Sequence, residues 1–454
     1  MKQPPRPNVI LINCDDLGYG DLGCYGSSRN STQNLDRLAH AGTRFTDFYM
    51  ASPVCSPSRG AMLTGCYPPR IGFDLFGNKH VLFPGDPFGL ADTEQTFASL
   101  LRDAGYATAL VGKWHCGDQP PFLPTRHGFD HYFGLPYSND MGRQIGERSH
   151  MPPLPLIEND TVVEQQPDMS ALTERYVAEA RRFITANRDQ PFLLYFAHMY
   201  VHLPLIVPER FLKRSDNGRY GAAVAVIDWA MGVLMQTLEK LGLADNTLIL
   251  FTSDNGSRVN NEGGSNGPLR GAKGSTEDGG MRLPLIAHWP GHVPANRTCN
   301  TLCSSIDLLP TLVNLAGAES PSLPIDGVDL TPTLLGDDDH TPREHFAYFR
   351  QNQLQAVRNQ RYKLCLARGK AFENEPLCEL YDLHEDIGET RDIAEQHPDV
   401  VQRLKQVADQ YNAELGPEGS ARRPSGKVDN PQPLTVYDAD YPYFAAEYDL
   451  GDAG

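Results

Sequence analysis

The chain has 454 residues, of which 40% are hydrophobic, and a formal net charge of −17 at pH 7. This length exceeds what one hydrophobic core usually organises, so we expect a large domain and a smaller one. The acidic balance argues against a nucleic-acid partner, because phosphate backbones are bound by basic surfaces, and an anionic substrate would need locally placed cations.

Neither a membrane span nor a secretory leader is evident in the sequence. No apolar run approaches the roughly 18 residues that a span needs, and the first predicted strand begins at Asn8. As given, the chain is expected in the cytoplasm, or in the periplasm or outside the cell if a leader has been removed. The nine cysteines, an odd number without paired spacing, indicate no disulfide framework, so we expect most to be reduced.

The first predicted element is a buried strand over 8–13 that ends in two carboxylates. Its sequence, Asn-Val-Ile-Leu-Ile-Asn, is typical of a parallel strand covered on both faces. Asp15 and Asp16 follow, at the edge where open α/β sheets place their ligands. Adjacent carboxylates repel each other, and a divalent cation would remove that repulsion; a solvated acidic turn is the alternative interpretation.

After a predicted helix over 34–42, the next segment carries the candidate nucleophile. It reads Ser-Pro-Val-Cys-Ser-Pro-Ser-Arg-Gly-Ala-Met-Leu-Thr-Gly. Pro57 and Ser58 suit a turn into a helix start, with Arg59 in the first turn, so free backbone N–H groups would favour an anion near Cys55. An inert buried thiol is the alternative interpretation of Cys55.

Two further predicted strands, over 107–111 and 192–197, also end in polar side chains. Four candidates follow these ends: Lys113, His115, His198 and His202. Ordinary surface residues are the alternative, but the position past a buried strand favours a role in a site. We expect one of the two later histidines to be structural.

A fourth strand of this kind, over 248–251, closes with Asp254 and Asn255, a second set of oxygen ligands. The glycine-rich stretch over 257–280 contains Arg270 and Lys273. Its composition indicates either simple flexibility or a lid around an anion.

Helices alternate with these strands along the chain. They are predicted over 96–105, 173–187, 221–242 and 304–317, with one more strand over 283–289. This alternation predicts an α/β fold with a large, mostly parallel sheet sandwiched by helices. Residues 116–168, rich in proline and glycine, are predicted to form long loops over the site, with Ser138 as a substrate contact.

Composition changes near Gly336, where three aspartates mark a solvated linker. We therefore predict a catalytic domain over 1–336 and a C-terminal subdomain over 337–454. The latter is expected to contain a small antiparallel sheet, a helix over 399–415 and an irregular tail that wraps back on the body. Its strands are predicted over 345–349, 355–357, 362–365 and 377–381.

Taken together, these motifs resemble those of the formylglycine-dependent type I sulfatases of the alkaline phosphatase superfamily, most closely arylsulfatase A and the galactosamine-sulfate sulfatases. The matching segments are Asp15-Asp16, Cys55 to Arg59, Gly112 to His115, Gly134 to Asp140, His202-x-Pro204, Asp254 to Gly256, Arg270 to Lys273 and Gly279 to Pro284. Their order and spacing agree over nearly the whole chain, which is more specific than any single motif. The resemblance implies an alkaline-phosphatase-like fold. The missing leader is a departure, since relatives are usually exported.

The resemblance implies a metal site and a nucleophile. Asp15, Asp16, Asp254 and Asn255 would hold one divalent cation together with an oxygen of the modified residue 55. These hard oxygen ligands suit Ca²⁺ or Mg²⁺ rather than zinc. Cys55 would be oxidised to formylglycine, which requires a formylglycine-generating or radical maturation enzyme as a partner.

The same resemblance implies the roles of the remaining residues. Lys113 and Lys273 would clamp the sulfate oxygens, and Arg59 would orient the hydrated aldehyde. One hydroxyl of that hydrate would attack sulfur, with His202 protonating the leaving alcohol. His115 would then take the proton of the second hydroxyl and expel sulfate. The substrate would be a small-molecule or glycan sulfate ester.

Two alternatives remain at this point. A phosphate or phosphonate ester hydrolase of the same superfamily would share the shape and in-line geometry of the reaction, although a two-metal phosphatase would need more His and Asp ligands than we can place. A catalytically inactive sulfate-binding relative would retain an unmodified Cys55.

Overall fold

The computed structural model describes residues 6–143, 150–369 and 375–440, and an 11-stranded mixed sheet forms the centre of this part of the chain. The strands are β1 (Asn8–Cys14), β2 (Thr43–Tyr49), β4 (Ala107–Gly112), β5 (His131–Gly134), β6 (Pro155–Glu158), β7 (Thr161–Gln165), β8 (Phe192–Ala197), β9 (Thr247–Ser253), β10 (Arg282–His288), β11 (Arg297–Cys299) and β12 (Cys303–Ser304). Their order is β11-β2-β10-β9-β1-β8-β4-β5-β6-β7, with β12 paired to β2. Strands β9, β1, β8 and β4 are adjacent and parallel, so their carboxyl ends meet at one edge.

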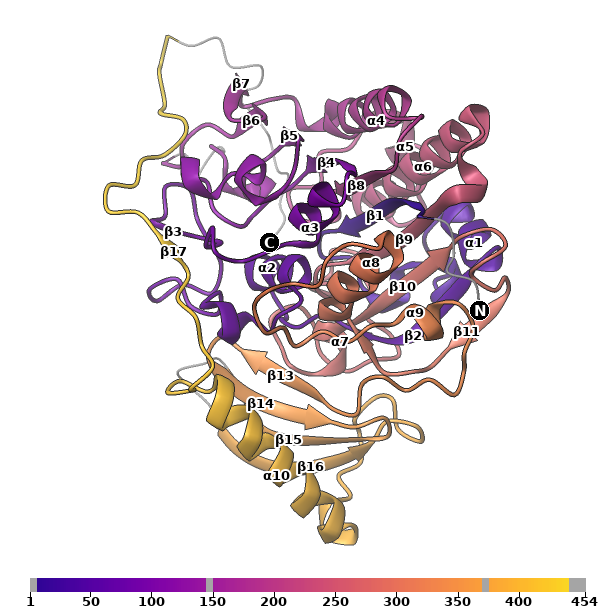
Figure 1. Ribbon diagram of the computed structural model, residues 1–454, viewed down its shortest axis with the longest axis vertical. Helices are drawn as coiled ribbons and strands as arrows, with labels where there is room; N and C mark the ends of the chain where they lie inside the picture. The colour runs from indigo at the N-terminus through magenta and orange to yellow at the C-terminus, as the bar shows by residue number, and fades with distance from the viewer. Residues whose placement is uncertain (1–5, 144–149, 370–374, 441–454) are drawn as a thin grey trace.

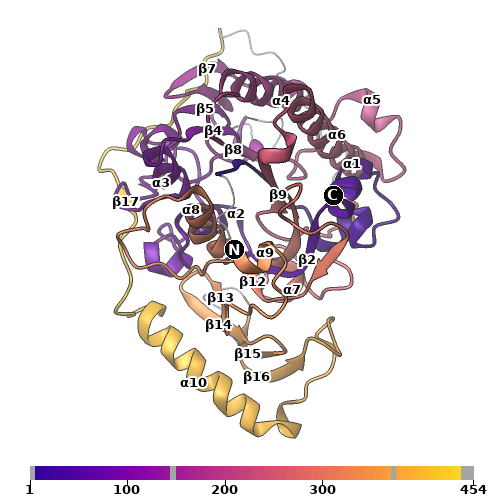
Figure 2. The same ribbon diagram turned by 45° about the vertical axis from the view of Figure 1, so that its right-hand side comes forward.

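Helices cover both faces of the sheet (Figures 1 and 2). They are α1 (Gln33–His40), α2 (Cys55–Thr64), α3 (Phe97–Asp103), α4 (Met169–Ala186), α5 (Glu209–Leu212), α6 (Gly218–Leu241), α7 (Asp278–Met281), α8 (Leu308–Ala316) and α9 (Thr331–Leu334). In β1, Ile10 and Ile12 pack with α1, α4 and α6, whereas Val9 and Leu11 pack with α2, α3 and α8. Burying each such side chain contributes roughly 1.5–3 kcal/mol, so β1 is anchored from two sides.

The predicted α/β class is confirmed, and the sheet is mixed. Strand β10 runs antiparallel to both β2 and β9, and β6 is antiparallel to β5 and β7. Strand β2 was not predicted, because the half-buried Arg44 and the buried Asp47 interrupt its apolar pattern. Residues of β5, β6 and β7 were predicted to form loops, because these short strands lie within a stretch rich in proline and glycine.

Helix α2 begins at Cys55, earlier than the predicted turn at Pro57 and Ser58. Pro57 is tolerated in the first helical turn, where its missing N–H has no helical acceptor to lose. The consequence is that Arg59 lies one turn further into the helix than expected, while Cys55 itself stands at the helix start.

One helix among the described residues, α6, is long and apolar enough to cross a membrane by length and composition alone. Sequence analysis recognised no segment of that kind. In the fold, 67% of the most apolar window of α6 is buried, and the helix packs against α1, α4 and α5. Its apolar character is explained by its position in the core.

A second, four-stranded antiparallel sheet follows, as predicted (Figure 1). Its strands are β13 (Phe346–Arg350), β14 (Gln353–Arg358), β15 (Tyr362–Arg368) and β16 (Glu375–Asp382), and α10 (Pro398–Leu415) packs on them. This sheet shares a hydrophobic core with Tyr49, Ala61 and Tyr67 of the body. The domain boundary at 336 stays a prediction.

The segment after α10 wraps back along the body, as expected, on the left side of Figure 1. Arg422 pairs with Asp74 at 2.9 Å, and Arg423 pairs with Glu94 at 2.6 Å. Beyond them β17 (Gly426–Lys427) pairs with β3 (Phe88–Gly89). These contacts tie the segment over 422–427 to the N-terminal half of the chain.

Buried charges join the C-terminal sheet to the body. The Lys363 ammonium on β15 lies 3.0 Å from an Asp278 carboxylate oxygen and 2.7 Å from a Glu389 oxygen. Lys363 and Asp278 are fully buried, and Arg282 approaches Asp278 at 3.5 Å. Such groups are stable in an apolar interior only when they remain paired.

We predict that Lys363→Met destabilises the protein by about 3–5 kcal/mol, because Asp278 and Glu389 are left without their common cation. The midpoint of urea unfolding measures this loss. The matched control is Arg403→Met, which removes an exposed partner of Asp399 and should leave the midpoint unchanged. Similar midpoints for the two variants would show that the buried pair does not hold the sheets together.

Candidate active site

The candidate site lies where four adjacent parallel strands end. Asp15 and Asp16 follow β1, Asp254 and Asn255 follow β9, Lys113 and His115 follow β4, and His198 and His202 follow β8. The strands approach closely at this edge: the Lys113 amide donates to the Ala197 carbonyl at 2.7 Å, and a Cβ on Gly112 would lie 1.9 Å from that oxygen. Only glycine fits at position 112, which explains the Gly-Lys-Trp-His motif.

Three carboxylates and one amide form the floor of the site, all at most 3% exposed. The Asp16 amide donates to Asp254 Oδ1 at 3.3 Å, and Asn255 Nδ2 donates to Asp16 Oδ1 at 2.6 Å. Asn255 Oδ1 is buried and accepts no hydrogen bond from the described residues. Burial and the Asp15 carboxylate raise the pKa of Asp254. The floor therefore offers oxygen ligands that the protein itself does not fully satisfy.

Cys55 is buried at the first position of α2, with Sγ 3.4 Å from Asp15 Oδ1. Burial, reinforced by Asp15 and Asp254, raises the pKa of its thiol well above the ordinary value. An unmodified Cys55 is therefore a neutral thiol at pH 7, which is a weak nucleophile. Position 55 is well placed for a nucleophile, but its unmodified thiol is not activated as one.

Three cations surround these carboxylates. Lys113 Nζ lies 2.5 Å from Asp15 Oδ2 and donates to Ser138 Oγ at 2.9 Å, and Lys273 Nζ lies 2.7 Å from Asp16 Oδ1. Burial alone would lower the pKa of both lysines, but the carboxylates outweigh it and the net shift is upward. Both ammonium groups are thus charged and available to an anion.

Arg59 is fully buried beneath the site and connects its parts. Its Nε donates to Asp254 Oδ2 at 2.8 Å, and its Nη1 donates to the Lys113 carbonyl at 2.8 Å. The family resemblance implies that Arg59 would orient the hydrated aldehyde at position 55. In the structure its hydrogen bonds go to Asp254 and Lys113, and the orienting role stays a prediction.

His115 has two different ring nitrogens. Nε2 lies 3.0 Å from the Leu82 carbonyl, which can only accept, so Nε2 carries the proton. Nδ1 is buried, and no described residue hydrogen-bonds to it. Burial and the nearby Lys113 charge hold the pKa of His115 well below its ordinary value. The ring is therefore neutral, with a lone pair on Nδ1.

The two histidines after β8 differ in their surroundings. His198 contacts Thr173 Oγ1 at 3.1 Å and accepts from the Tyr200 amide at 3.0 Å, and burial lowers its pKa to about 3. His202 instead reaches the site, with Nε2 3.8 Å from Asp16 Oδ2 and Nδ1 2.7 Å from the Leu203 carbonyl. His198 is thus held within the protein, whereas His202 faces the reacting region.

Backbone strain coincides with two of these positions. Asp16 has φ = 62° and His115 has φ = 63°, in the left-handed region that β-carbon-bearing residues seldom adopt. Such conformations persist where surrounding contacts impose them, and they cluster at functional sites. Both residues are held by hydrogen bonds from neighbouring strand ends, including the His115 amide to the Pro136 carbonyl at 3.0 Å.

A cavity of about 190 Å³ opens above Cys55. Its lining includes the predicted residues Cys55, His115, Ser138, His202 and Lys273. Sequence analysis missed His80, Val81, Phe83 and Met141, which also line it. They come from loops without a strand end or a periodic pattern to mark them. Three of the four, Val81, Phe83 and Met141, are apolar.

The structure brings all the predicted site residues into one cluster. Asp15, Asp16, Cys55, Arg59, Lys113, Ser138, Asp254, Asn255 and Lys273 are linked by the contacts above, and His115 and His202 line the same cavity. Ligand atoms of Asp15, Asp16, Cys55 and His202 lie within 4.8 Å of one another. His202 was not expected to belong to the group of potential metal ligands.

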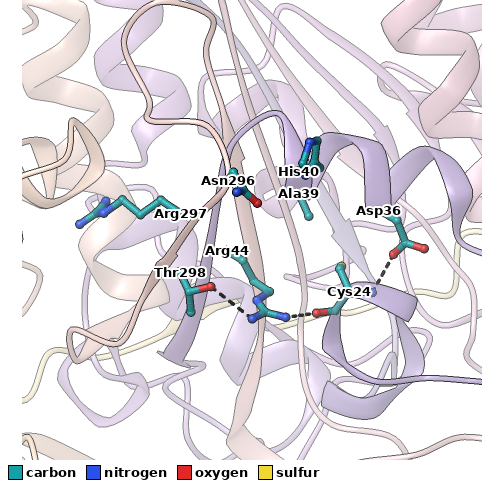
Figure 3. Close-up of a pocket in the computed structure, with 8 residues that line it drawn as sticks. All are labelled: Cys24, Asp36, Ala39, His40, Arg44, Asn296, Arg297 and Thr298. Atoms are coloured by element: carbon teal, nitrogen blue, oxygen red, sulfur yellow. Dashed lines mark hydrogen bonds between the residues drawn. The ribbon is translucent and has the colours of Figure 1, made fainter.

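A second cavity, of about 230 Å³, is lined by residues of α1, β2 and β11 and by their neighbours (Figure 3). Arg44, near the start of β2, donates to Thr298 Oγ1 at 3.2 Å and to the Cys24 carbonyl. Asp36 accepts from the Cys24 amide at 2.7 Å. Several polar groups that line this cavity thus bond to one another. None of the predicted site residues is among the residues that line it.

Comparison with known proteins identifies the class that this fold and site define. The family model described as "Sulfatase" matches residues 7–318, and that described as "N-sulphoglucosamine sulphohydrolase, C-terminal" matches 273–414. Arylsulfatase A of Homo sapiens is 39% identical over 445 residues, covering 88% of this chain and 87% of the relative. N-acetylgalactosamine-6-sulfatase of Rattus norvegicus is 41% identical over 376 residues, covering 79% and 71%. These relatives are sulfuric ester hydrolases.

The solved structures agree. The crystal structure of Ps i-CgsB in complex with k-i-k-neocarrahexaose aligns with a TM-score of 0.79 and 30% identity, covering 91% of this chain and 95% of that one. The phosphonate monoester hydrolase of Agrobacterium radiobacter aligns with a TM-score of 0.64 at 22% identity, a likeness of fold alone. The chain is thus an enzyme of the sulfuric ester hydrolase class. It belongs to the sulfatase family.

Proposed function

We propose that this enzyme hydrolyses sulfate monoesters of phenols or sugars and releases inorganic sulfate, using formylglycine formed from Cys55 and one divalent cation. The observation that carries the proposal is the cavity above Cys55, which is lined by Lys273, His115 and His202, with Lys113 hydrogen-bonded to the lining residue Ser138. A maturation enzyme, either formylglycine-generating or radical, would supply the modification.

The donor set fits a divalent cation. Asp15, Asp16 and Asp254 carry three negative charges, and Lys113, Lys273 and Arg59 carry three positive ones, so the cluster is neutral. An anionic ester would add uncompensated negative charge, which a divalent cation would balance. Hard oxygen ligands, including the unsatisfied Asn255 Oδ1, suit Ca²⁺ or Mg²⁺. When bound, the cation would polarise the sulfate and stabilise charge near position 55.

Position 55 also fits the modified residue. It stands at the start of α2, where free backbone N–H groups favour negative charge, and next to Asp15. A hydrated aldehyde there would supply a hydroxyl as nucleophile and a second hydroxyl for the release of sulfate.

The remaining residues would bind the ester and move protons. Lys113 and Lys273 would bind sulfate oxygens, with Ser138 fixing the Lys113 ammonium. His202, at the edge of the cavity, would protonate the leaving alcohol. The neutral His115 would accept a proton at Nδ1, the nitrogen without a protein partner. The apolar residues Val81, Phe83 and Met141, which also line the cavity, would contact an aromatic or sugar ring.

The first experiment is intact mass spectrometry of natively produced protein, combined with turnover of the sulfate and phosphate esters of one phenol. We expect Cys55 to be converted and the sulfate ester to be preferred. Preference for the phosphate ester would favour a phosphatase, and an unmodified Cys55 with no turnover would favour an inactive sulfate-binding relative.

Metal removal should abolish activity. We expect Ca²⁺ or Mg²⁺ to raise the melting temperature of the chelated wild type and to restore turnover, because the cation binds the folded carboxylate cluster. Asp254→Ala should lose both effects while remaining folded by circular dichroism. Asp160→Ala, an exposed carboxylate elsewhere, is the control. Full turnover by chelated protein would rule out the assigned metal role.

Replacing the nucleophile tests the modification. Cys55→Ser provides one hydroxyl where the hydrated aldehyde would provide two, so we expect no multiple turnover of a nitrophenyl sulfate. Cys24→Ser, at a half-buried cysteine outside the site, should retain wild-type activity. Repeated turnover by Cys55→Ser, measured as more than one product per enzyme, contradicts the proposal.

The role of His202 predicts a dependence on the leaving group. A nitrophenolate departs without a proton, whereas a sugar alkoxide needs one, so His202→Ala should slow sugar sulfates about 10²- to 10⁴-fold and nitrophenyl sulfate much less. His115→Ala should slow both esters alike, because it acts after the alcohol has left. The ratio of kcat/KM values for the two esters measures the difference. Equal losses for His202→Ala would assign the acid to another group.

A further inference from the structure

The Leu82 carbonyl determines which nitrogen of His115 is free. Nε2 donates to that carbonyl at 3.0 Å, and this leaves Nδ1 as the lone-pair nitrogen in the cavity wall. If the carbonyl moved away, the neutral ring could place its proton on either nitrogen. Whatever fixes the Leu82 backbone therefore fixes the useful tautomer of His115.

The main chain at Leu82 is in turn held by Ser56. The Leu82 amide donates to Ser56 Oγ at 3.1 Å, and both residues are buried. Ser56 belongs to the first turn of α2, directly after Cys55. A single residue of the loop thus connects the helix that carries the nucleophile position to the ring of His115.

The other anchors of this loop lie further along it. The Phe83 amide donates to Asp86 Oδ2 at 2.8 Å, Lys79 pairs with Asp86 at 2.5 Å, and the Gly85 amide donates to Asp118 Oδ2 at 2.7 Å. These bonds hold the end of the loop. None of these bonds involves the Leu82 amide. If the Ser56 hydroxyl were absent, that amide would be buried without an acceptor.

We propose that Ser56 is a positioning residue that, through the Leu82 main chain, fixes the proton of His115 on Nε2 and presents Nδ1 to the reacting centre. This inference rests on the proposed function for its effect on turnover. The tautomer itself is a property of the folded chain and does not depend on the modification of Cys55.

The kinetic test compares two pairs of variants that differ only in a hydroxyl: wild type with Ser56→Ala, and Ser56→Thr with Ser56→Val. We expect loss of the hydroxyl to lower kcat on nitrophenyl sulfate about 3- to 10-fold, the effect of one hydrogen bond, with KM unchanged. Rates are expressed per converted Cys55, measured by mass spectrometry, because Ser56 adjoins the modified residue. Ser99→Ala, which removes the hydroxyl that accepts from the Thr96 amide in the capping box of α3, is the control for stability loss and should keep kcat unchanged.

The second test uses the unmodified protein with ¹⁵N-labelled histidine. In the wild type, the His115 resonances, assigned by their loss in His115→Ala, should report protonated Nε2 and bare Nδ1. In Ser56→Ala both nitrogens should shift toward the average of the two tautomers, and in Ser56→Thr they should not. An unchanged tautomer in Ser56→Ala, or in Ser56→Val if Ser56→Ala does not fold, overturns the inference. Absence of sulfatase activity in converted wild-type protein would instead refute the proposed function and leave the tautomer test standing.

Discussion

The convergence of four parallel strand ends is the constraint on which the site depends. Because β9, β1, β8 and β4 are neighbours and run the same way, the residues that follow them must share one edge of the sheet. That edge brings three carboxylates together in a buried region, where they are unfavourable without compensation. Two lysines and Arg59 supply it, and each lies within 4 Å of a carboxylate. The resulting cluster carries no net charge, because three cationic side chains offset three carboxylates.

Segments outside the sheet hold the parts of this cluster that the strands do not fix. Lys273 lies in a glycine-rich stretch that is bound by the C-terminal sheet: Thr276 Oγ1 donates to Gln355 Oε1 at 2.8 Å, and Lys363 donates to the Thr276 carbonyl at 2.9 Å. The segment after α10 likewise holds the residues that follow His115. There the Gln119 side chain donates to the Gln432 carbonyl at 2.9 Å and accepts from its amide at 2.9 Å. The C-terminal part of the chain is therefore part of the site's support.

The sequence predicted the α/β class and the strand ends at which the candidate residues lie, but not the short strands at one side of the sheet. Asp15, Lys113 and Asp254 directly follow recognisable buried strands, and His202 lies a few residues after another; in a parallel sheet such positions lie close together. The functional roles of these residues stay predictions. The edge strand β7, whose side chains are half-buried or exposed, has no comparable pattern. His80 and Phe83 were missed because loop residues reach a cavity through tertiary contacts, and a sequence without periodicity records none of these. The start of α2 was misplaced because a proline can occupy several positions of a first helical turn.

The two histidines to which the proposed reaction assigns opposite proton-transfer roles have different surroundings. His115 is enclosed, has Lys113 near it, and has its proton directed to a main-chain carbonyl, so its remaining nitrogen can only accept. His202 instead has Nδ1 2.7 Å from the Leu203 carbonyl and Nε2 3.8 Å from Asp16 Oδ2, so the two rings contact different parts of the chain. A change in the loop that carries Leu82 would therefore alter the proposed proton acceptance by His115 and leave these contacts of His202 in place.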